Sequence, residues 1–223
     1  LVDTIFCVSH AQREKLVSEG APGDKMMVIH NGVDLERFPV GPPELHDPMT
    51  LVFSGALVYD KGLHLLIGSF IDLKQKYPKL RLEVFGSASL WSREEYLDIG
   101  ALARELPDVV FHGRVPQERI AEGFRRSGLC VIPSPWFDPF PLTSLEAQVS
   151  GCPVVTYRVG GLPEGLVEGK TGVVVEDISQ HALTAALDRL LDDPMRLREM
   201  SRHCTEIARE RFRWEMVVDL IIR

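Results

Sequence analysis

Two acidic residues, Asp138 and Glu146, lie eight positions apart at the end of a Pro-rich segment. Pro139 and Pro141 disfavour helix before residue 141 but suit the first turn of one, so the sequence predicts a helix over residues 141–150. Glu146 would then lie one turn inside this helix, where its carboxylate can accept hydrogen bonds from paired hydroxyls such as those of a ribose. Asp138 would project from the preceding loop. A plainer interpretation makes Asp138 a helix-start cap and Glu146 a solvated helical acid.

The first turn of the same predicted helix is a second place for chemistry, because its amides have no partners within the helix. Such amides attract anions. We expect those of Leu142, Thr143 and Ser144 to be unpaired and to face a ligand. The helical spacing of Leu142, Leu145 and Val149 predicts that these three side chains face a core.

Short apolar runs alternate with amphipathic helical patterns along most of the chain, which predicts an α/β fold with a Rossmann-like parallel sheet and helices on both faces. Near the N-terminus we expect a strand, a helix and a turn over residues 2–9, 11–19 and 20–24. The other predicted strands cover residues 50–53, 80–85, 109–111, 129–132, 153–157 and 172–175. The other predicted helices cover residues 62–77, 93–105, 116–127, 141–150, 162–167, 179–191 and 194–211.

The loops after five of these strands carry the candidate binding residues. Ligands in parallel sheets bind beyond the carboxyl ends of the strands, so the five loops are expected to form one cleft for a nucleotide. Glycines in them allow close approach of backbone to ligand, although strand-end glycines also serve ordinary turns. In chain order the candidates are Gly55, Ala56 and Lys61; Gly86; Gly113, Arg114 and Val115; Asp138, Phe140, Pro141, Leu142 and Thr143; and Gly160 and Gly161.

Several segments in the same order resemble the retaining glycosyltransferases of the GT-B architecture, in their glycogen-synthase-like and mannosyltransferase-like branch. The family pattern is a Glu, seven residues and a second Glu in Leu-Glu-Ala, followed by Gly-x-Pro-Val-Val and Gly-Gly-x-x-Glu. Glu146 corresponds to the second Glu, and Asp138 replaces the first, which keeps the charge on a shorter side chain. The strand and loop that follow are residues 151–155 and 160–164. The remaining matches are residues 28–38, 54–62 and 212–215.

This resemblance implies an enzyme that binds a nucleotide sugar of the UDP or GDP type and transfers the sugar to an acceptor with retention of anomeric configuration. Lys61 and the loop amides at 142–143 and 160–161 would stabilise charge on the departing diphosphate. Asp138 would orient the donor sugar, Glu146 would bind the ribose, and the loop 113–115 would lie near the base. No metal or other cofactor is implied, since the acids are spaced for hydroxyls and no His or Asp cluster supplies hard-cation ligands.

One position departs from the family where charge matters. The family has an Arg in the loop after the first strand of this domain, and that Arg acts with the Lys to neutralise the donor diphosphate. This chain has Ala56 there and keeps only Lys61. Arg114, Arg158 and Lys170 are candidates to replace the missing cation.

The resemblance also implies a division into domains. Residues 1–27 would be the end of an N-terminal, acceptor-side domain with the hinge, and residues 28–211 a C-terminal nucleotide-sugar-binding domain. Residues 212–223 would begin a helix that returns to the N-terminal domain. Recognition of a carbohydrate, lipid-linked or other acceptor would then reside in the missing domain. His10 is expected at the surface or at a helix start.

Composition agrees with this interpretation. The 223 residues are 45% hydrophobic, enough to bury a full core, and the net charge of −7 argues against a nucleic-acid surface. No apolar run reaches the roughly 20 residues that span a bilayer, and no signal peptide is recognisable. Four scattered cysteines suit buried thiols in a reducing compartment. We therefore expect a cytoplasmic protein, with peripheral membrane association left open for the full-length chain.

Other functions remain as alternatives. Ala56 and Asp138 are compatible with a non-catalytic relative that binds a nucleotide or a partner protein. An epimerase or a phosphorylase on the same plan of two Rossmann-like domains fits the acidic pair and Gly-Gly loop less well. A dinucleotide-dependent oxidoreductase is disfavoured, because no Gly-x-Gly-x-x-Gly follows the first strand of the main sheet.

Overall fold

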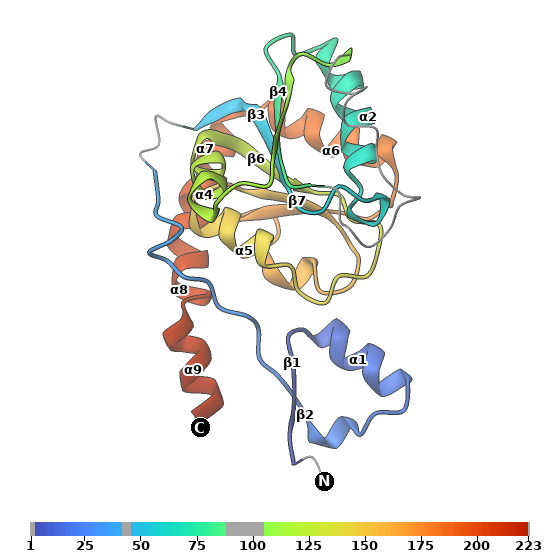
Figure 1. Cartoon of the computed structure of the whole chain (residues 1–223), viewed down its shortest axis with the longest axis vertical. Helices are drawn as coiled ribbons and strands as arrows, with labels where there is room; N and C mark the ends of the chain where they lie inside the picture. Colours follow the sequence, from blue (N-terminus) through green and yellow to red (C-terminus); the bar gives the residue numbers. More distant parts are fainter. Residues whose placement is uncertain (1–2, 42–45, 88–104, 223) are drawn as a thin grey trace.

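The centre of the computed structural model is a parallel sheet of six strands in the spatial order β5-β4-β3-β6-β7-β8 (Figure 1). The structure describes residues 3–41, 46–87 and 105–222. Within them the strands are β3 (Asp47–Ser54), β4 (Arg81–Phe85), β5 (Val109–Gly113), β6 (Ser127–Ile132), β7 (Val154–Tyr157) and β8 (Gly172–Val175). This order, with every neighbouring pair parallel, confirms the Rossmann-like fold.

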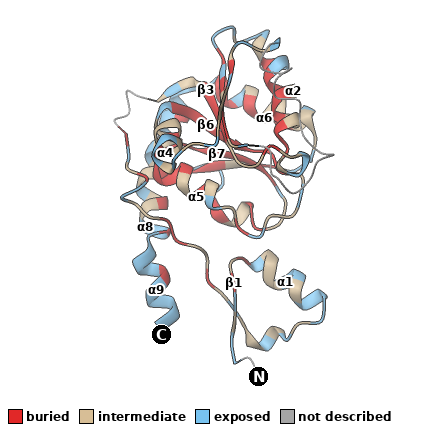
Figure 2. Ribbon diagram, in the orientation of Figure 1, coloured by how far each residue is buried: buried red, intermediate tan, exposed pale blue. Residues whose placement is uncertain are grey.

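Helices cover both faces of this main sheet and bury its strands. Every residue of β6 is buried, which explains why its sequence is apolar throughout rather than alternating. Figure 2 shows the buried residues concentrated along the strands and the inner sides of the helices. One face packs against α2 (Leu63–Lys74), α6 (Gln180–Leu191) and α7 (Pro194–His203), and the other against α4 (Gln117–Arg126) and α5 (Leu142–Val149).

A separate N-terminal segment, residues 3–28, lies below the main sheet in Figure 1. Its β1 (Ile5–Cys7) and β2 (Met26–Val28) form a two-stranded parallel sheet, and α1 (His10–Ser18) and the short η1 (Gly23–Lys25) connect them. No residue of α1 is buried. Apolar packing therefore contributes little to holding this helix, and polar contacts must do more.

The linker after β2, residues 29–38, runs beside the C-terminal end of the chain. The amide of Val33 donates to the Phe212 carbonyl at 2.8 Å, and a Cβ on Gly32 would lie 2.8 Å from the Trp214 ring. The linker and the C-terminal end of the chain are therefore in direct contact. The C-terminal elements are the π-helical η5 (Cys204–Ala208), α8 (Arg209–Arg211) and α9 (Trp214–Ile222).

Most elements fall where the sequence predicts them; two predicted helices differ, and a third is not tested. The predicted helix over 162–167 is reduced to a 3-10 turn, η4 (Pro163–Gly165), because Leu166 returns to an extended backbone. The predicted helix over 194–211 contains the π-helical turn η5. The predicted helix over 93–105 lies almost wholly outside the described residues.

One further expectation is borne out. All four cysteines are free and buried, as expected for structural thiols. Among the residues that the structure describes, no helix has the length and apolar character needed to cross a membrane.

Candidate functional site

The strand order places a crevice at the centre of the main sheet. β3 and β6 are neighbours, and the chain continues from β3 towards β4 on one side and from β6 towards β7 on the other. Loops that leave neighbouring strands in opposite directions open a gap at the carboxyl edge, where ligands of such sheets bind. The two loops at this gap are residues 55–62 and 133–141, and both carry predicted site residues.

Lys61 and Asp138 meet across this crevice. Lys61 ends the 3-10 turn η3 (Tyr59–Lys61), and its Nζ lies 2.8 Å from Oδ2 of Asp138. The carboxylate is the more enclosed partner, with 13% of its side chain exposed against 41% for Lys61. The sequence assigned these two residues to different parts of a ligand, and the structure brings them together as an ion pair.

Two glycines allow the loops of the crevice to pack this closely. Gly62 has φ +73°, and a Cβ there would lie 1.8 Å from the Pro133 carbonyl oxygen. Gly161 donates its amide to the Asp138 carbonyl at 2.8 Å, and a Cβ on it would lie 1.8 Å from the Pro139 oxygen. The loop 160–164 is thus joined directly to the backbone that carries Asp138.

Glu146 lies on α5, partly shielded from solvent. Burial raises the pKa of its carboxyl, and a hydrogen bond from Gln117 opposes that effect. Gln117, at the start of α4, donates from Nε2 to Glu146 Oε1 at 3.2 Å. Sequence reasoning missed Gln117, because this residue belongs to a different helix whose packing against α5 only the fold reveals.

The start of α5 corrects part of the sequence-based interpretation. The amide of Ser144 is paired, because the first turn tightens and the Pro141 carbonyl accepts its hydrogen at 3.1 Å. Leu145 and Val149 are buried as predicted, whereas Leu142 faces outwards with 48% of its surface exposed. Leu142 therefore does not contribute to the core.

The loops after β3, β4 and β5 lie side by side at the same edge. Gly86 donates its amide to the Gly113 carbonyl at 2.9 Å, and Gly55 donates to the Phe85 carbonyl at 3.0 Å. Gly86 has φ +139°, and a Cβ there would lie 1.8 Å from the Gly55 oxygen. Thr143 Oγ1 donates to the Ser54 carbonyl at 3.5 Å, which brings α5 to the same edge. The predicted loop residues thus share one rim of the sheet.

The other predicted residues differ in exposure. Ala56 and Val115 are partly buried, Arg114 is exposed, and the ring of Phe140 is buried against the imidazole of His30 at a centroid distance of 4.8 Å. Phe140 therefore supports the loop 133–141 by packing against His30. Pro141 is partly exposed at the start of α5.

The three cations that were candidates to replace the missing Arg differ in their position on the sheet and in their ion pairs. Arg158 follows β7, but its guanidinium pairs with Glu176 at 2.7 Å and with Glu168 at 3.3 Å. Lys170 precedes β8 and so lies at the amino edge of the sheet, away from the crevice. Arg114 follows β5 at the carboxyl edge. Of the three, Arg114 alone combines the correct edge with a side chain outside such a cluster.

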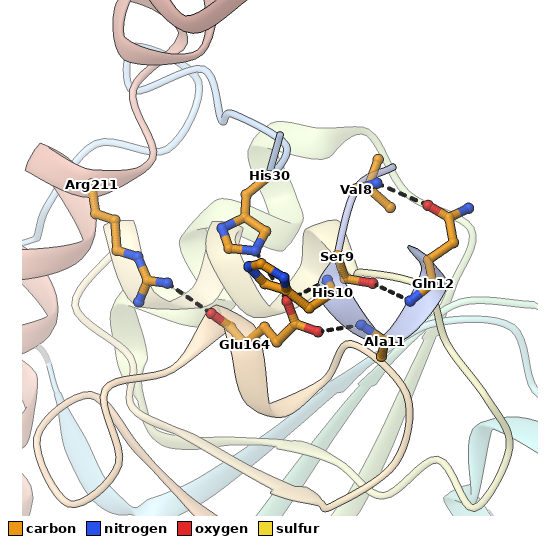
Figure 3. Close-up of polar contacts among 8 residues, drawn as sticks. All are labelled: Val8, Ser9, His10, Ala11, Gln12, His30, Glu164 and Arg211. Atoms are coloured by element: carbon orange, nitrogen blue, oxygen red, sulfur yellow. Dashed lines mark hydrogen bonds and ion pairs between the residues drawn. The ribbon is translucent and has the colours of Figure 1, made fainter. Parts of the chain in front are cut away.

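Glu164, the acid of the Gly-Gly-x-x-Glu motif, contacts the N-terminal segment rather than the crevice (Figure 3). Its carboxylate accepts the amide hydrogens of His10 at 2.7 Å and Ala11 at 2.8 Å, and its Oε2 lies 3.2 Å from His30 Nε2. His10 is the exposed first residue of α1, in agreement with its expected surface or helix-start role.

The same three residues are a group to consider for a metal ion. The ligand atoms of His10, His30 and Glu164 lie within 4.8 Å of one another. Both oxygens of the Glu164 carboxylate already accept amide hydrogens, so a cation would compete with the hydrogen bonds at the start of α1. The arrangement is better explained as a helix cap.

A twisted parallel sheet with glycine loops, an ion pair and a shielded acid at its switch point defines a Rossmann-like ligand-binding domain. Residues 36–211 match the family model described as Glycosyl transferases group 1, and residues 1–37 match the model described as Glycosyltransferase Family 4. The chain therefore belongs to the group 1 glycosyltransferase family.

Among curated relatives, the glycogen synthase of Mycobacterium tuberculosis is 29% identical over 217 residues, which cover 96% of this chain and 52% of that protein. The D-inositol 3-phosphate glycosyltransferase 2 of Catenulispora acidiphila is 33% identical over 213 residues, covering 87% of this chain and 49% of that protein. The chain thus spans about half the length of these curated relatives.

Two solved structures show the same fold. Sucrose-phosphate synthase from Thermosynechococcus elongatus aligns with a TM-score of 0.85 at 23% identity, over 99% of this chain and 57% of that one. Anabaena HepE in complex with UDP aligns with a TM-score of 0.87 at 20% identity, over 100% of this chain and 63% of that one. HepE has also been solved with UDP-glucose.

Proposed function

We propose that this chain is the donor-binding part of a glycosyltransferase that takes a sugar from a nucleoside diphosphate of the UDP or GDP type. The observation that carries the proposal is the Lys61–Asp138 pair at the switch point, with Glu146 on the helix that follows. A cation, a sugar-orienting acid and a shielded acid are the groups that a nucleotide sugar needs. The complexes of HepE with UDP and with UDP-glucose support this choice of ligand.

Each residue has a part in this proposal. Lys61 and the amides of Leu142, Thr143 and Gly160 stabilise negative charge on the departing diphosphate, whereas the Gly161 amide, which was also expected to do so, is taken by the Asp138 carbonyl. Asp138 orients the donor sugar and balances positive charge near its anomeric carbon, and the product keeps the configuration of that carbon. Glu146 accepts hydrogen bonds from the ribose hydroxyls, where a partly buried carboxylate binds more strongly than a solvated one.

The proposal extends to the organisation of the whole protein. Residues 1–27 are the end of an acceptor-side domain, residues 28–211 form the donor-binding domain, and residues 212–223 begin the helix that returns to the first domain. The separate sheet formed by β1 and β2 supports this division. The acceptor, a carbohydrate, a lipid-linked molecule or another compound, is bound by the preceding domain of a cytoplasmic enzyme, with no metal in the donor site.

Calorimetric titration with UDP, GDP, ADP and NAD tests the donor assignment. We expect one nucleoside diphosphate to bind selectively. Glu146→Ala should weaken that binding by about 1–3 kcal/mol, roughly 5- to 150-fold, through loss of charge-assisted hydrogen bonds. Glu118→Ala removes an exposed acid from α4 and is the matched control, for which we expect no change.

The outcome separates the proposal from its alternatives. Unchanged affinity in a folded Glu146→Ala variant would remove Glu146 from the site. Binding of NAD in place of a nucleoside diphosphate would favour an oxidoreductase. If no nucleotide bound to the full-length protein, a non-catalytic relative would be favoured. Ala56 and the ion pairing of Lys61 with Asp138 are the observations that point to this alternative.

A further inference from the structure

Glu164 joins three parts of the chain that are distant in sequence. Its carboxylate contacts the first turn of α1 and His30 of the linker, and its backbone oxygen accepts a hydrogen bond from Arg211 of α8 at 3.0 Å (Figure 3). Only about a fifth of its side chain is exposed. The residue therefore lies where the start of α1, the linker and α8 meet.

The start of α1 depends on Glu164 for two of its first three amides. The amides of His10, Ala11 and Gln12 precede the first regular helical bond, which runs from the Arg13 amide to the Ser9 carbonyl at 3.1 Å, so they have no partners within the helix. The Ser9 side chain accepts that of Gln12 at 3.0 Å. Glu164 accepts the other two, and α1 has no acid of its own in its first turn. Glu164 thus supplies both the missing acceptors and the negative charge that a helix start favours.

The ionisation of Glu164 agrees with this role. Burial alone would raise the pKa of the carboxyl, but the amides of Ala11 and His10 and the imidazole of His30 outweigh it and lower the pKa. The residue is therefore held as a carboxylate with both oxygens occupied.

The same contacts reach the crevice through the loop 160–164. Gly161 is hydrogen-bonded to the Asp138 carbonyl, and a Cβ on Gly161 would lie 2.9 Å from Cβ of Ser9. On the other side of Asp138, Lys15 of α1 lies over the ring of Phe137 at 5.6 Å. The N-cap of α1 thus approaches Gly161 on one side of Asp138, and Lys15 of α1 lies over the Phe137 ring on the other, while no residue of α1 is buried.

We propose that Glu164 is a positioning residue that fixes Asp138 and the loop 160–164 relative to the N-terminal segment, and so aligns the donor sugar with the acceptor. The inference rests on the proposed function. Most of the proposed nucleotide-binding groups lie in the loops after β3 and β5 and on α5 and do not contact Glu164, whereas the relative placement of the two reactants depends on this contact. A displacement of about 1 Å between reacting groups can cost about 100-fold in rate.

The test uses the full-length enzyme with Glu164→Gln. Gln matches the size of Glu but offers a single oxygen, and its NH2 group would face one of the two α1 amides donor to donor. Glu168→Gln is the matched control, because Glu168 is an exposed acid four residues later whose partner is Arg158. We expect Glu164→Gln to lower kcat at least tenfold with less than a threefold change in the Kd for the nucleoside diphosphate, and Glu168→Gln to change neither.

Hydrogen exchange gives a second readout that does not depend on turnover. The amides of His10 and Ala11 should exchange faster in Glu164→Gln, while those of the main sheet keep their protection. A kcat within twofold of the unmodified enzyme would overturn the proposal. Loss of kcat and of nucleotide binding in parallel, with general loss of protection, would also overturn it and make Glu164 a purely structural residue.

Failure of the proposed function is distinguishable from failure of this inference. If the unmodified full-length protein bound no nucleotide and transferred no sugar, both would fall, although exchange at His10 and Ala11 would still report the contact itself. If the unmodified enzyme is active and Glu164→Gln is equally active, only the positioning role is refuted.

Discussion

Replacing Asp138 with Asn should tighten nucleoside diphosphate binding and at the same time slow sugar transfer. In the structure Lys61 is held by Asp138 at 2.8 Å, so a diphosphate that recruits Lys61 must compete with this carboxylate. Asn keeps the shape of Asp and removes the charge. The ammonium then becomes available to the phosphates, and the repulsion between the Asp138 carboxylate and the diphosphate disappears.

The magnitude follows from the exposure of the pair. Fully exposed ion pairs contribute about 0.2–1 kcal/mol, and this one has side-chain exposures of 41% and 13%, so we place it near the upper end of that range. A difference of about 1 kcal/mol corresponds to roughly fivefold tighter binding. Transfer should fall at least tenfold, because the acid that orients the donor sugar is lost.

Calorimetry and initial-rate measurements on the full-length enzyme check both expectations. Asp60→Asn is the matched control, since it removes an exposed acid beside Lys61. The double variant Lys61→Met with Asp138→Asn should gain less affinity over Lys61→Met alone than Asp138→Asn gains over the unmodified enzyme, and the difference is the part of the gain that is due to Lys61. Unchanged or weaker diphosphate binding in Asp138→Asn would refute the competition between carboxylate and phosphate.

Two other predictions concern the loop 160–164. Gly161→Ala should lower the free energy of unfolding by about 2 kcal/mol or more, because its Cβ would lie 1.8 Å from the Pro139 oxygen. The control is Gly169→Ala, where φ is +76° but the space around the new Cβ is open, and it should lower the free energy of unfolding by only about 1–2 kcal/mol. Chemical denaturation measures both. The second concerns acid. The pKa of Glu164 is lowered below its ordinary 4.5 on folding, so its stabilising contribution is complete above pH 4.5 and is lost as the pH falls through the lowered pKa. The difference in unfolding free energy between the unmodified protein and Glu164→Gln should therefore shrink in denaturation series from pH 7 to pH 3, and a constant difference would contradict the bond pattern.

The main sheet was predictable because its strands are buried on both faces. A strand such as β6, buried at every residue, appears in the sequence as an uninterrupted apolar run between turn residues. Helix ends were less predictable. The residues at 162–167 have helical spacing, but Leu166 is extended and the amide of Val167 donates to the Thr171 side chain at 2.9 Å instead of to a helical carbonyl, so only the 3-10 turn η4 forms.

The site was predictable in its residues and not in its contacts. The resemblance placed Lys61, Asp138 and Glu146 on a common rim, because parallel strands bring their carboxyl ends together. It did not indicate that Lys61 pairs with Asp138 across 77 positions of sequence or that Gln117 reaches Glu146. Such contacts depend on side-chain directions that neither spacing nor composition contains.

The Lys61–Asp138 pair and the absent Arg at position 56 have a joint consequence. With Ala56 in that loop, Lys61 is the cation that the loop offers, and Asp138 neutralises it while no ligand is bound. The site then presents little net positive charge to a diphosphate before it binds. The amides of Leu142 and Thr143 at the start of α5 and that of Gly160 are then the groups that attract the phosphates first, because their dipoles do not depend on Lys61. On this view Lys61 moves from Asp138 to the phosphate as the donor binds, and the freed carboxylate turns to the sugar.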